Sequence, residues 1–546
     1  MITARFNHKT VLARHKTAEP FRALFVRWSW LILGAAGALQ CILFCTITNV
    51  LAVACVLLAW LVVSSIFLRS GLLYVFPLSI FLILGFTATQ FCFPMVFTLL
   101  EGKPLIYNLL LPEQVFFHSL AALLALLAGH AVYRHLAQSG RYRTSSGLAK
   151  AGFFSPPSDL QLWLMGFLGV LATAYVLFVS QETGMKISGS AVSKAFQSIM
   201  PFSYAPYFIP LGQLYGNDKD KSKKLVPQLL LFTIVLLLLS MGRNSRGSFM
   251  LGFTSLGLAY GIGLLMGIFK TQIFSIKTVL IGVACVLLVT GPLADLGTAM
   301  VIVRGQRNGI STTELMEHTF QAFGDKAAIA ARRAADKLEE NDWDERYLDN
   351  VFTARFANLK FNDISLVQAS KISPQDPAML NYSIDYVLGG MPTPILNALQ
   401  VNIDKEAVYS VSIGDYLFLK AGGGTEALGG FRTGHFAGTG MAAFGWWYLL
   451  WLFVGIMPVY YLFDRFFIAQ YRRSGANGPV PRFSLCGLLV ITTIFQFLPA
   501  ESVVVTATFL LRGWVQLVLL YFLLYHFTRL ISAALSRERT NPSLYL

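Results

Sequence analysis

Charged residues are scarce in this chain. Only 13% of its 546 residues are Asp, Glu, Lys or Arg, whereas 55% are hydrophobic and the mean hydropathy is +0.60. Soluble domains keep about a quarter of their residues charged, so this composition excludes a soluble globular protein. It predicts an all-α polytopic membrane protein in which successive apolar runs form transmembrane helices.

Sequence patterns for metal, disulfide and nucleotide sites are also missing. The six cysteines all lie in apolar runs, and none belongs to a CxxC pair or a His/Cys cluster. Neither HExxH nor GxxxxGK[ST] occurs. We therefore expect no disulfide, no structural zinc, no catalytic metal and no cofactor, and we interpret the cysteines as small apolar packing residues.

The positive net charge of +15 suits two classes of partner. In a soluble protein it would favour nucleic acid, but in a membrane protein the excess of Lys and Arg in cytoplasmic loops explains most of it. We therefore expect membrane lipid as a partner and no nucleic acid. Residues 1–27 are basic and lack a small-residue cleavage site, which predicts a cytoplasmic arm on anionic headgroups and an uncleaved first span.

Apolar runs long enough to cross a bilayer predict about twelve membrane spans. Nine fall in residues 28–293 and three in residues 441–530, followed by a cytoplasmic tail at 531–546. With the N-terminus inside, alternation places the basic loops after the even-numbered spans in the cytoplasm. The C-terminus then lies in the cytoplasm as well.

Local signals set several of the span boundaries. Thr48-Asn49 is the expected turn between the first two spans, and Asp159 is the expected cap of the fifth. The eleventh span is expected over Ser484–Leu498. Three prolines predict a kinked or discontinuous sixth span: Pro201, Pro206 and Pro210.

The polar region of residues 294–440, between the ninth and tenth spans, is too long for a simple connection. Ser311-Thr312-Thr313-Glu314 has a capping-box pattern before a helix with an apolar stripe, and a second helical stretch covers about Glu345–Lys371. Residues 422–440 are rich in glycine, which predicts flexibility or close approach of the backbone. On the alternation above, this region is a helical loop on the outer, periplasmic side.

A short turn, Gly242-Arg243-Asn244-Ser245-Arg246-Gly247, joins the seventh and eighth spans. Asn and Gly suit a tight turn. Arginine near hydrocarbon is costly, and among the short loops only this one opposes the bias of Lys and Arg towards the cytoplasm. An anionic ligand at the outer membrane surface is the simplest reason to keep both arginines.

Four features together resemble the bacterial O-antigen and oligosaccharide-repeat-unit polymerases. They are the 242–247 turn, the arginine-bearing loop before the tenth span, the strip His435–Trp447, and Pro499-Ala500-Glu501-Ser502 followed by Arg512. The resemblance implies a membrane glycosyltransferase of O-antigen or exopolysaccharide biosynthesis in the bacterial cell inner membrane. It also implies an undecaprenyl-pyrophosphate-linked oligosaccharide as substrate and a chain-length regulator as a candidate partner.

Transfer of a glycan from a lipid pyrophosphate needs cations for the leaving group and a base for the acceptor hydroxyl. Arginine stays charged and binds phosphate oxygens bidentately. The outer arginines are therefore the predicted pyrophosphate-binding residues, although some could simply extend to lipid headgroups: Arg243, Arg246, Arg304, Arg307, Arg432 and Arg512.

The base is predicted among the outer titratable residues, of which His435 and Glu501 are the first choices. His435 lies next to the tenth span, and Glu501 lies between apolar runs, where a carboxylate is expensive. A solvated histidine and a structural ion pair with Arg512 are the alternative interpretations. The remaining candidates are His318, Asp295, Asp415 and Glu426.

The predicted function is polymerisation, in which a growing glycan moves from undecaprenyl pyrophosphate onto a new lipid-linked repeat at the outer face of the membrane. A ligase, which moves the glycan to another acceptor, fits the same residues. A lipid-glycan transporter or flippase is the alternative from another class. It would favour internal repeats and charges at mid-membrane, and neither is evident in the sequence.

Overall fold

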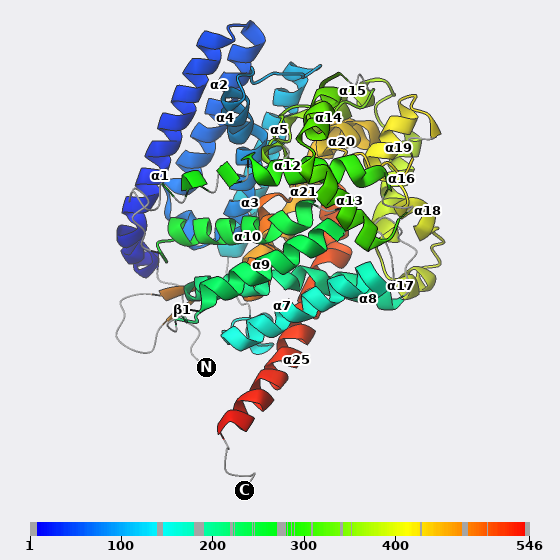
Figure 1. Ribbon diagram of the computed structural model, residues 1–546. Helices are drawn as coiled ribbons and strands as arrows, with labels where there is room; N and C mark the ends of the chain where they lie inside the picture. The colour runs from blue at the N-terminus through cyan, green and yellow to red at the C-terminus, as the bar shows by residue number, and fades with distance from the viewer. Residues whose placement is uncertain are drawn as a thin grey trace.

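The structure is a computed structural model, and helices make up most of it (Figure 1). It describes residues 8–138, 146–179, 191–218, 222, 224–242, 244, 246–269, 280, 282–284, 287–288, 290–306, 310–338, 342–350, 352–425, 428–471, 479–498 and 501–540.

Eight helices in the described part of the chain are long and apolar enough to cross a membrane. This confirms an all-α polytopic membrane protein. The eight segments are Phe21–Leu43, Ile47–Leu68, Pro77–Leu100, Pro112–Ala137, Asp159–Val179, Leu225–Gly242, Phe436–Asp464 and Val505–Leu535. Two shorter apolar helices are Met250–Leu265 and Pro292–Ile302, and most of the predicted ninth span lies outside the described residues.

The first half of the chain supplies most of these segments. Its helices are α1 His8–Leu43, α2 Ile47–Val63, η1 Ser64–Leu68, η2 Gly71–Tyr74, α3 Pro77–Thr87, η3 Ala88–Cys92, α4 Phe93–Leu100, α5 Pro112–Gln138, α6 Ser146–Lys150, α7 Asp159–Ala174, η4 Tyr175–Val179, α8 Ala191–Ile199, η5 Met200–Leu214, α9 Leu225–Gly242, α10 Arg246–Leu265 and α12 Pro292–Ile302.

The predicted polar loop is a set of short helices, here called the cap. It comprises η6 Val303–Gln306, α13 Thr312–Gly324, α14 Lys326–Leu338, η7 Thr353–Phe356, α15 Leu359–Ser370, α16 Pro377–Gly389, α17 Thr393–Ala398, α18 Lys405–Tyr409 and α19 Ile413–Lys420. The chain then continues through α20 Phe436–Phe444, η9 Gly445–Trp447, α21 Tyr448–Asp464, α22 Leu485–Leu489, α23 Ile491–Phe495, α24 Val505–Thr508, η10 Phe509–Gly513 and α25 Trp514–Thr540.

Several boundaries differ from the sequence-based expectation. Ser158, not Asp159, caps α7, because its hydroxyl accepts the N–H of Gln161. The eleventh span is not continuous, since α22 and α23 break at Val490. A two-stranded antiparallel hairpin, β1 Phe467–Tyr471 and β2 Pro479–Phe483, was not predicted.

Hydrogen bonds join the connecting segments into two groups at opposite ends of the helices. At one end, here called the terminal end, the bonds are Arg22 to Ser70, Asn217 to Pro157, Arg482 to Phe154, and Ser158 to Ser532. At the other end, here called the cap end, they are Gln40 to Lys103, Asn244 to Met300, Thr312 to Leu177, and Gln496 to Arg355.

A buried ion pair fastens the cap to the loop between α4 and α5. The Lys360 ammonium donates to the Asp363 carboxylate at 2.9 Å, with only 2% and 0% of the side chains exposed. Asp363 also accepts the backbone N–H groups of Leu110 and Leu111 at 2.8 and 2.7 Å. A buried pair offsets its desolvation cost only when further hydrogen bonds satisfy it, and these backbone donors supply them.

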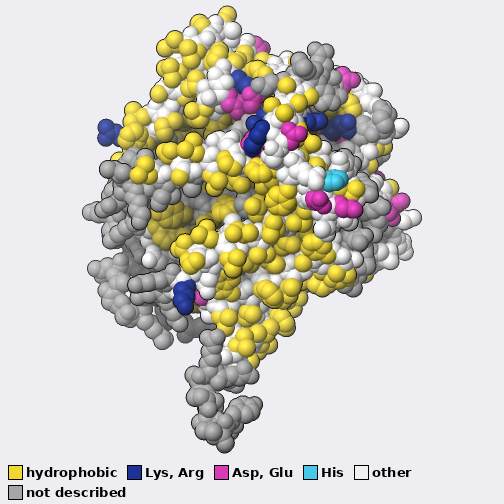
Figure 2. All heavy atoms as spheres, in the orientation of Figure 1, with side chains coloured by type: hydrophobic (Ala, Val, Ile, Leu, Met, Phe, Trp, Pro, Cys, Tyr) yellow, Lys and Arg dark blue, Asp and Glu magenta, His cyan; other side chains and the backbone are white. Residues whose placement is uncertain are grey.

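The distribution of side chains on the surface agrees with the division into a terminal end and a cap end. Figure 2 shows hydrophobic side chains over much of one face, with most of the charged side chains gathered over its upper part. In Figure 1 the C-terminal part of α25 extends below the body, whereas α14, α15 and α19 lie in its upper part. A long apolar face of this kind is expected of a surface in contact with lipid.

Candidate active site

The turn between α23 and α24, residues 496–504, carries a strained acidic residue. Glu501 has a φ of +39°, a conformation that non-glycine residues rarely adopt. The Thr439 hydroxyl donates to the Glu501 carbonyl oxygen at 2.8 Å and so ties the turn to the first helical turns of α20. Backbone strain of this kind persists where the surroundings hold it, and such positions are concentrated at functional sites.

The carboxyl group of Glu501 is kept partly out of solvent. Burial raises its pKa above the usual value of 4.5, and the nearby negative charge of Asp415 raises it further. Among the described residues no hydrogen bond or ion pair engages this carboxylate. A carboxyl group with a raised pKa and free oxygens suits proton transfer to or from a ligand.

Hydrogen bonds hold the Asp415 carboxylate, which lies near Glu501, in a fixed position. This buried carboxylate accepts the backbone N–H groups of Phe431 and Arg432 at 2.8 and 3.0 Å, and the Arg432 guanidinium at 3.2 Å. That guanidinium also lies over the Phe418 ring, 4.7 Å from its centroid. Arg432 therefore has a fixed place, where it balances the buried charge of Asp415.

Four tyrosines of the cap lie beside this carboxyl pair. Tyr382 stacks on Tyr416 with ring centroids 4.0 Å apart, and Tyr386 packs against Tyr409 at 5.0 Å. Burial raises the pKa of Tyr382 and Tyr386, and the charge of Glu501 contributes to both shifts. Aromatic rings with polar edges beside a carboxylate suit the flat faces and hydroxyls of a sugar.

Three cations from distant parts of the sequence come together next to these tyrosines. Burial lowers the pKa of Lys405, and the positive charges of Arg512 and Lys194 lower it further. Arg512 also lowers the pKa of Tyr409, although burial raises it more strongly. Figure 1 shows α8, which carries Lys194, on the same side of the molecule as α18, which begins with Lys405.

None of these three cations forms an ion pair with another described residue. The Lys405 ammonium donates to the Met391 carbonyl oxygen, and the Arg512 Nε donates to the Gln516 side chain at 3.2 Å. Cations that repel one another without a counter-charge favour an anionic ligand, and phosphate oxygens accept from both Lys and Arg. We refer to Lys194, Lys405 and Arg512 as the cation cluster.

A second pair of cations, Arg304 and Arg355, lies near the start of the same turn. Burial lowers the pKa of Arg355, and the positive charge of Arg304 lowers it further. The Gln496 amide donates to the Arg355 carbonyl oxygen at 3.3 Å, which places the start of the 496–504 turn against this pair. Arg304 is exposed and lies in η6.

The 242–247 turn lies close to the Arg304 segment. The Asn244 side chain, in a residue with φ of +50°, donates to the Met300 carbonyl oxygen at 2.9 Å. Met300 is one helical turn before Arg304. Arg243 and Arg307 themselves lie outside the described residues, and of Arg246 only the backbone, which begins α10, is described.

His435 lies inside the protein, next to the start of α20. It is fully buried, its Nε2 is 3.2 Å from the Gln90 amide nitrogen, and its Nδ1 has no partner among the described residues. Burial lowers its pKa to about 3, and the charge of His118 contributes to this shift. The imidazole is therefore neutral and away from solvent. The role of His435 as a base stays a prediction.

The other predicted acid–base candidates have different surroundings. Asp295 pairs with Lys326 at 2.7 Å and Arg333 at 2.8 Å. His318 contacts the Gln306 side chain at 2.6 Å, and Glu426 lies outside the described residues. In the described part of the chain no group of three His, Cys, Asp or Glu side chains is placed to hold a metal ion.

Sequence reasoning missed Lys194, Lys405 and the four tyrosines. Lys194 and Lys405 lie more than 200 residues apart in the sequence, so no local pattern groups them. The only signal for them is that both fall in segments predicted on the outer side. Comparison with known proteins adds nothing to this assignment. No protein-family model, curated protein or solved structure matches the chain.

Proposed function

We propose that this chain is a membrane glycosyltransferase that polymerises lipid-linked oligosaccharide repeats at the outer face of a bacterial inner membrane. The observation that carries the proposal is the placement of the unpaired Glu501 carboxyl group near the cation cluster, with tyrosine rings between them. Its substrate is an oligosaccharide on undecaprenyl pyrophosphate. The resemblance in the sequence supports this substrate class.

In the proposed reaction, an acceptor hydroxyl oxygen attacks the anomeric carbon of the growing glycan. The bond between that carbon and the pyrophosphate oxygen breaks, and its electron pair leaves with the diphosphate. Glu501 takes the proton of the hydroxyl. Lys405 and Arg512 stabilise the negative charge that develops on the leaving diphosphate. The negative charge of Asp415 raises the basicity of Glu501, and Arg432 holds the Asp415 carboxylate in place.

A polymerase binds two lipid diphosphates, one on the donor and one on the acceptor. Two separate groups of cations lie near the 496–504 turn: the cation cluster, and the Arg304 and Arg355 pair. We assign the second pair, together with the arginines of the 242–247 turn, to the second diphosphate. This doubling favours a polymerase over a ligase, whose acceptor needs no diphosphate. The ligase is the second candidate.

The test is Glu501→Gln in cells that make the polymer. This substitution keeps the shape of the side chain and removes the base. We expect loss of polymer and accumulation of a single lipid-linked repeat, seen as a collapse of the ladder on a gel. Glu317→Gln in α13, an exposed acidic residue of the cap, is the matched control and should keep the ladder. A normal ladder from Glu501→Gln at normal protein level would contradict the proposal.

A further inference from the structure

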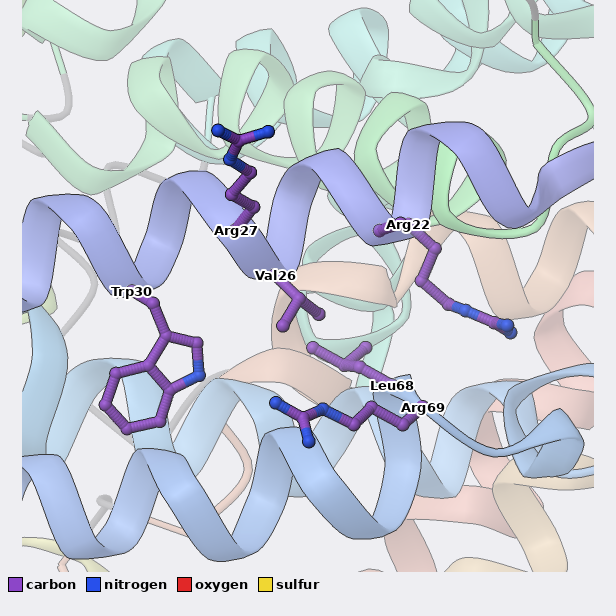
Figure 3. Close-up of a pocket in the computed structure, with 7 residues that line it drawn as sticks. Arg22, Val26, Arg27, Trp30, Leu68 and Arg69 are labelled. Atoms are coloured by element: carbon purple, nitrogen blue, oxygen red, sulfur yellow. The ribbon is translucent and has the colours of Figure 1, made fainter.

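A separate pocket of about 370 Å³ lies at the terminal end, between α1 and the end of the second span. Figure 3 shows its lining, with Val26 and Leu68 as an apolar wall. Every charged side chain in the lining is an arginine: Arg22, Arg27 and Arg69. The volume is in the range of small-ligand sites, and the charge selects an anion.

Two hydrogen-bond donors face each other in this pocket. In Figure 3 the Arg69 guanidinium and the Trp30 indole nitrogen point towards one another beneath Val26. The indole N–H is covered by protein and has no acceptor among the described residues. Arg69 is exposed and forms no ion pair or side-chain hydrogen bond with any described residue. An indole nitrogen can only donate, so a covered one without a partner is unfavourable until an acceptor reaches it.

The neighbouring arginines have different roles. The Arg22 guanidinium is buried, donates to the Ser70 carbonyl oxygen at 3.3 Å and so fixes the end of the second span next to Arg69. Arg27 points to the other side of α1 in Figure 3 and adds positive charge at the pocket edge. The ligand is therefore expected between Trp30 and Arg69.

We propose that this pocket binds the phosphate of an anionic phospholipid headgroup, which accepts from Arg69 and from the Trp30 indole N–H. The pocket lies where two membrane segments, Phe21–Leu43 and Ile47–Leu68, have their ends, at the depth that headgroups and interfacial tryptophans occupy. Beyond it the same helices expose Leu31 (53%), Ile32 (52%) and Leu61 (47%), a surface that suits acyl chains. These apolar residues favour a lipid over free phosphate.

The test is native mass spectrometry of the full chain in detergent, with phosphatidylglycerol or phosphatidylcholine of the same acyl chains. Phosphatidylglycerol should bind more tightly, and Arg69→Gln should weaken the first binding event about tenfold, as expected for loss of a charge-assisted hydrogen bond. Trp30→Phe keeps a ring in place and removes only the N–H, and it should weaken binding severalfold. Arg529→Gln, an exposed arginine of α25 near the C-terminus, is the matched control and should bind as the wild type does.

Three results would overturn the proposal. One is equal binding of the two lipids by the wild type. Another is unchanged phosphatidylglycerol binding by both Arg69→Gln and Trp30→Phe, each at wild-type thermal stability. The third is displacement of the lipid by inorganic phosphate at the same concentration, which would identify a site for free phosphate. This site is independent of glycan transfer, so loss of polymerase activity has no bearing on it.

Discussion

At the scale of single residues, Glu501 combines features that are costly for a folded protein. Its backbone is in a left-handed conformation, and its carboxyl group is partly buried beside the negative charge of Asp415. Glycine or asparagine would suit this backbone better, and a neutral side chain would suit this environment better. A residue that is unfavourable on both counts is best explained by the chemistry of its side chain.

The pH dependence of transfer follows from the raised pKa of Glu501. A base must be ionised, so the rate should fall as the pH drops through the raised pKa of Glu501. Asp415→Asn removes a negative charge and frees the Arg432 guanidinium, and both changes lower the pKa of Glu501. The acidic limb of a rate–pH profile should therefore move to lower pH in this variant, and it should stay in place in Glu317→Gln. An acidic limb that moves to higher pH in Asp415→Asn would contradict the assignment of Glu501 as the base.

At the scale of helices and turns, the sequence predicted features that depend on neighbouring residues, such as helix caps. It did not predict features that depend on contacts between distant segments. The capping box is present, because Ser311 accepts the N–H of Glu314 and Glu314 accepts the N–H of Ser311. The turn between the first two spans falls just before the predicted position, since Thr46 caps α2 and Asn49 is buried against Gln40. Such signals act over a few residues and can be read from the chain alone.

Other features depend on neighbours that are distant in the sequence. The break of the tenth span at Gly445, with φ of +55°, occurs where the Gln375 side chain packs against it. The cation cluster needs α8, α18 and η10 to meet, and no short pattern encodes that meeting. The sequence could therefore predict Arg512 as a phosphate ligand, but not that Lys194 and Lys405 would be its companions.

The cation cluster should act as a unit in substrate binding. Arg512→Gln and Lys405→Gln should each weaken the binding of a lipid-linked diphosphate about tenfold, because each removes a charge-assisted hydrogen bond. Lys371→Gln, an exposed lysine just after α15, should have no effect. Binding is measured with a fluorescent lipid diphosphate in nanodiscs. Wild-type affinity in both variants would remove the cluster from the mechanism.

The cap helices should depend on the buried Lys360–Asp363 pair for their attachment. Asp363→Ala leaves the buried ammonium without a counter-charge and two backbone N–H groups without an acceptor, which should cost about 3–5 kcal/mol. Asp295→Ala breaks surface ion pairs with Lys326 and Arg333 and should cost about 1 kcal/mol or less. Thermal unfolding of the two variants in detergent measures the difference. Equal destabilisation would contradict the role of the buried pair.

At the scale of the whole molecule, composition and hydropathy were sufficient for the class of fold, because the lipid environment allows few alternatives to apolar helices. The hydrogen bonds group the connections at a terminal end and a cap end. The location of the terminal end in the cytoplasm is a prediction from the distribution of Lys and Arg.

The orientation can be measured with single cysteines. We expect Lys371→Cys in the cap to react with a membrane-impermeant maleimide in intact spheroplasts, and Arg529→Cys in α25 to react only after the membrane is opened. The background has the native cysteines replaced by alanine, since Cys45 is exposed. The opposite labelling pattern would place the candidate active site in the cytoplasm and would exclude polymerisation at the outer face.

The most direct measurement is the product of the purified protein in liposomes supplied with one lipid-linked repeat unit and nothing else. We expect a ladder of products that grows by whole repeats with the wild type. With Glu501→Gln, at equal protein and equal thermal stability, we expect only the starting repeat. A ladder of the same length from Glu501→Gln, or no product longer than the starting repeat from the wild type, would contradict the central claim that Glu501 serves a polymerase.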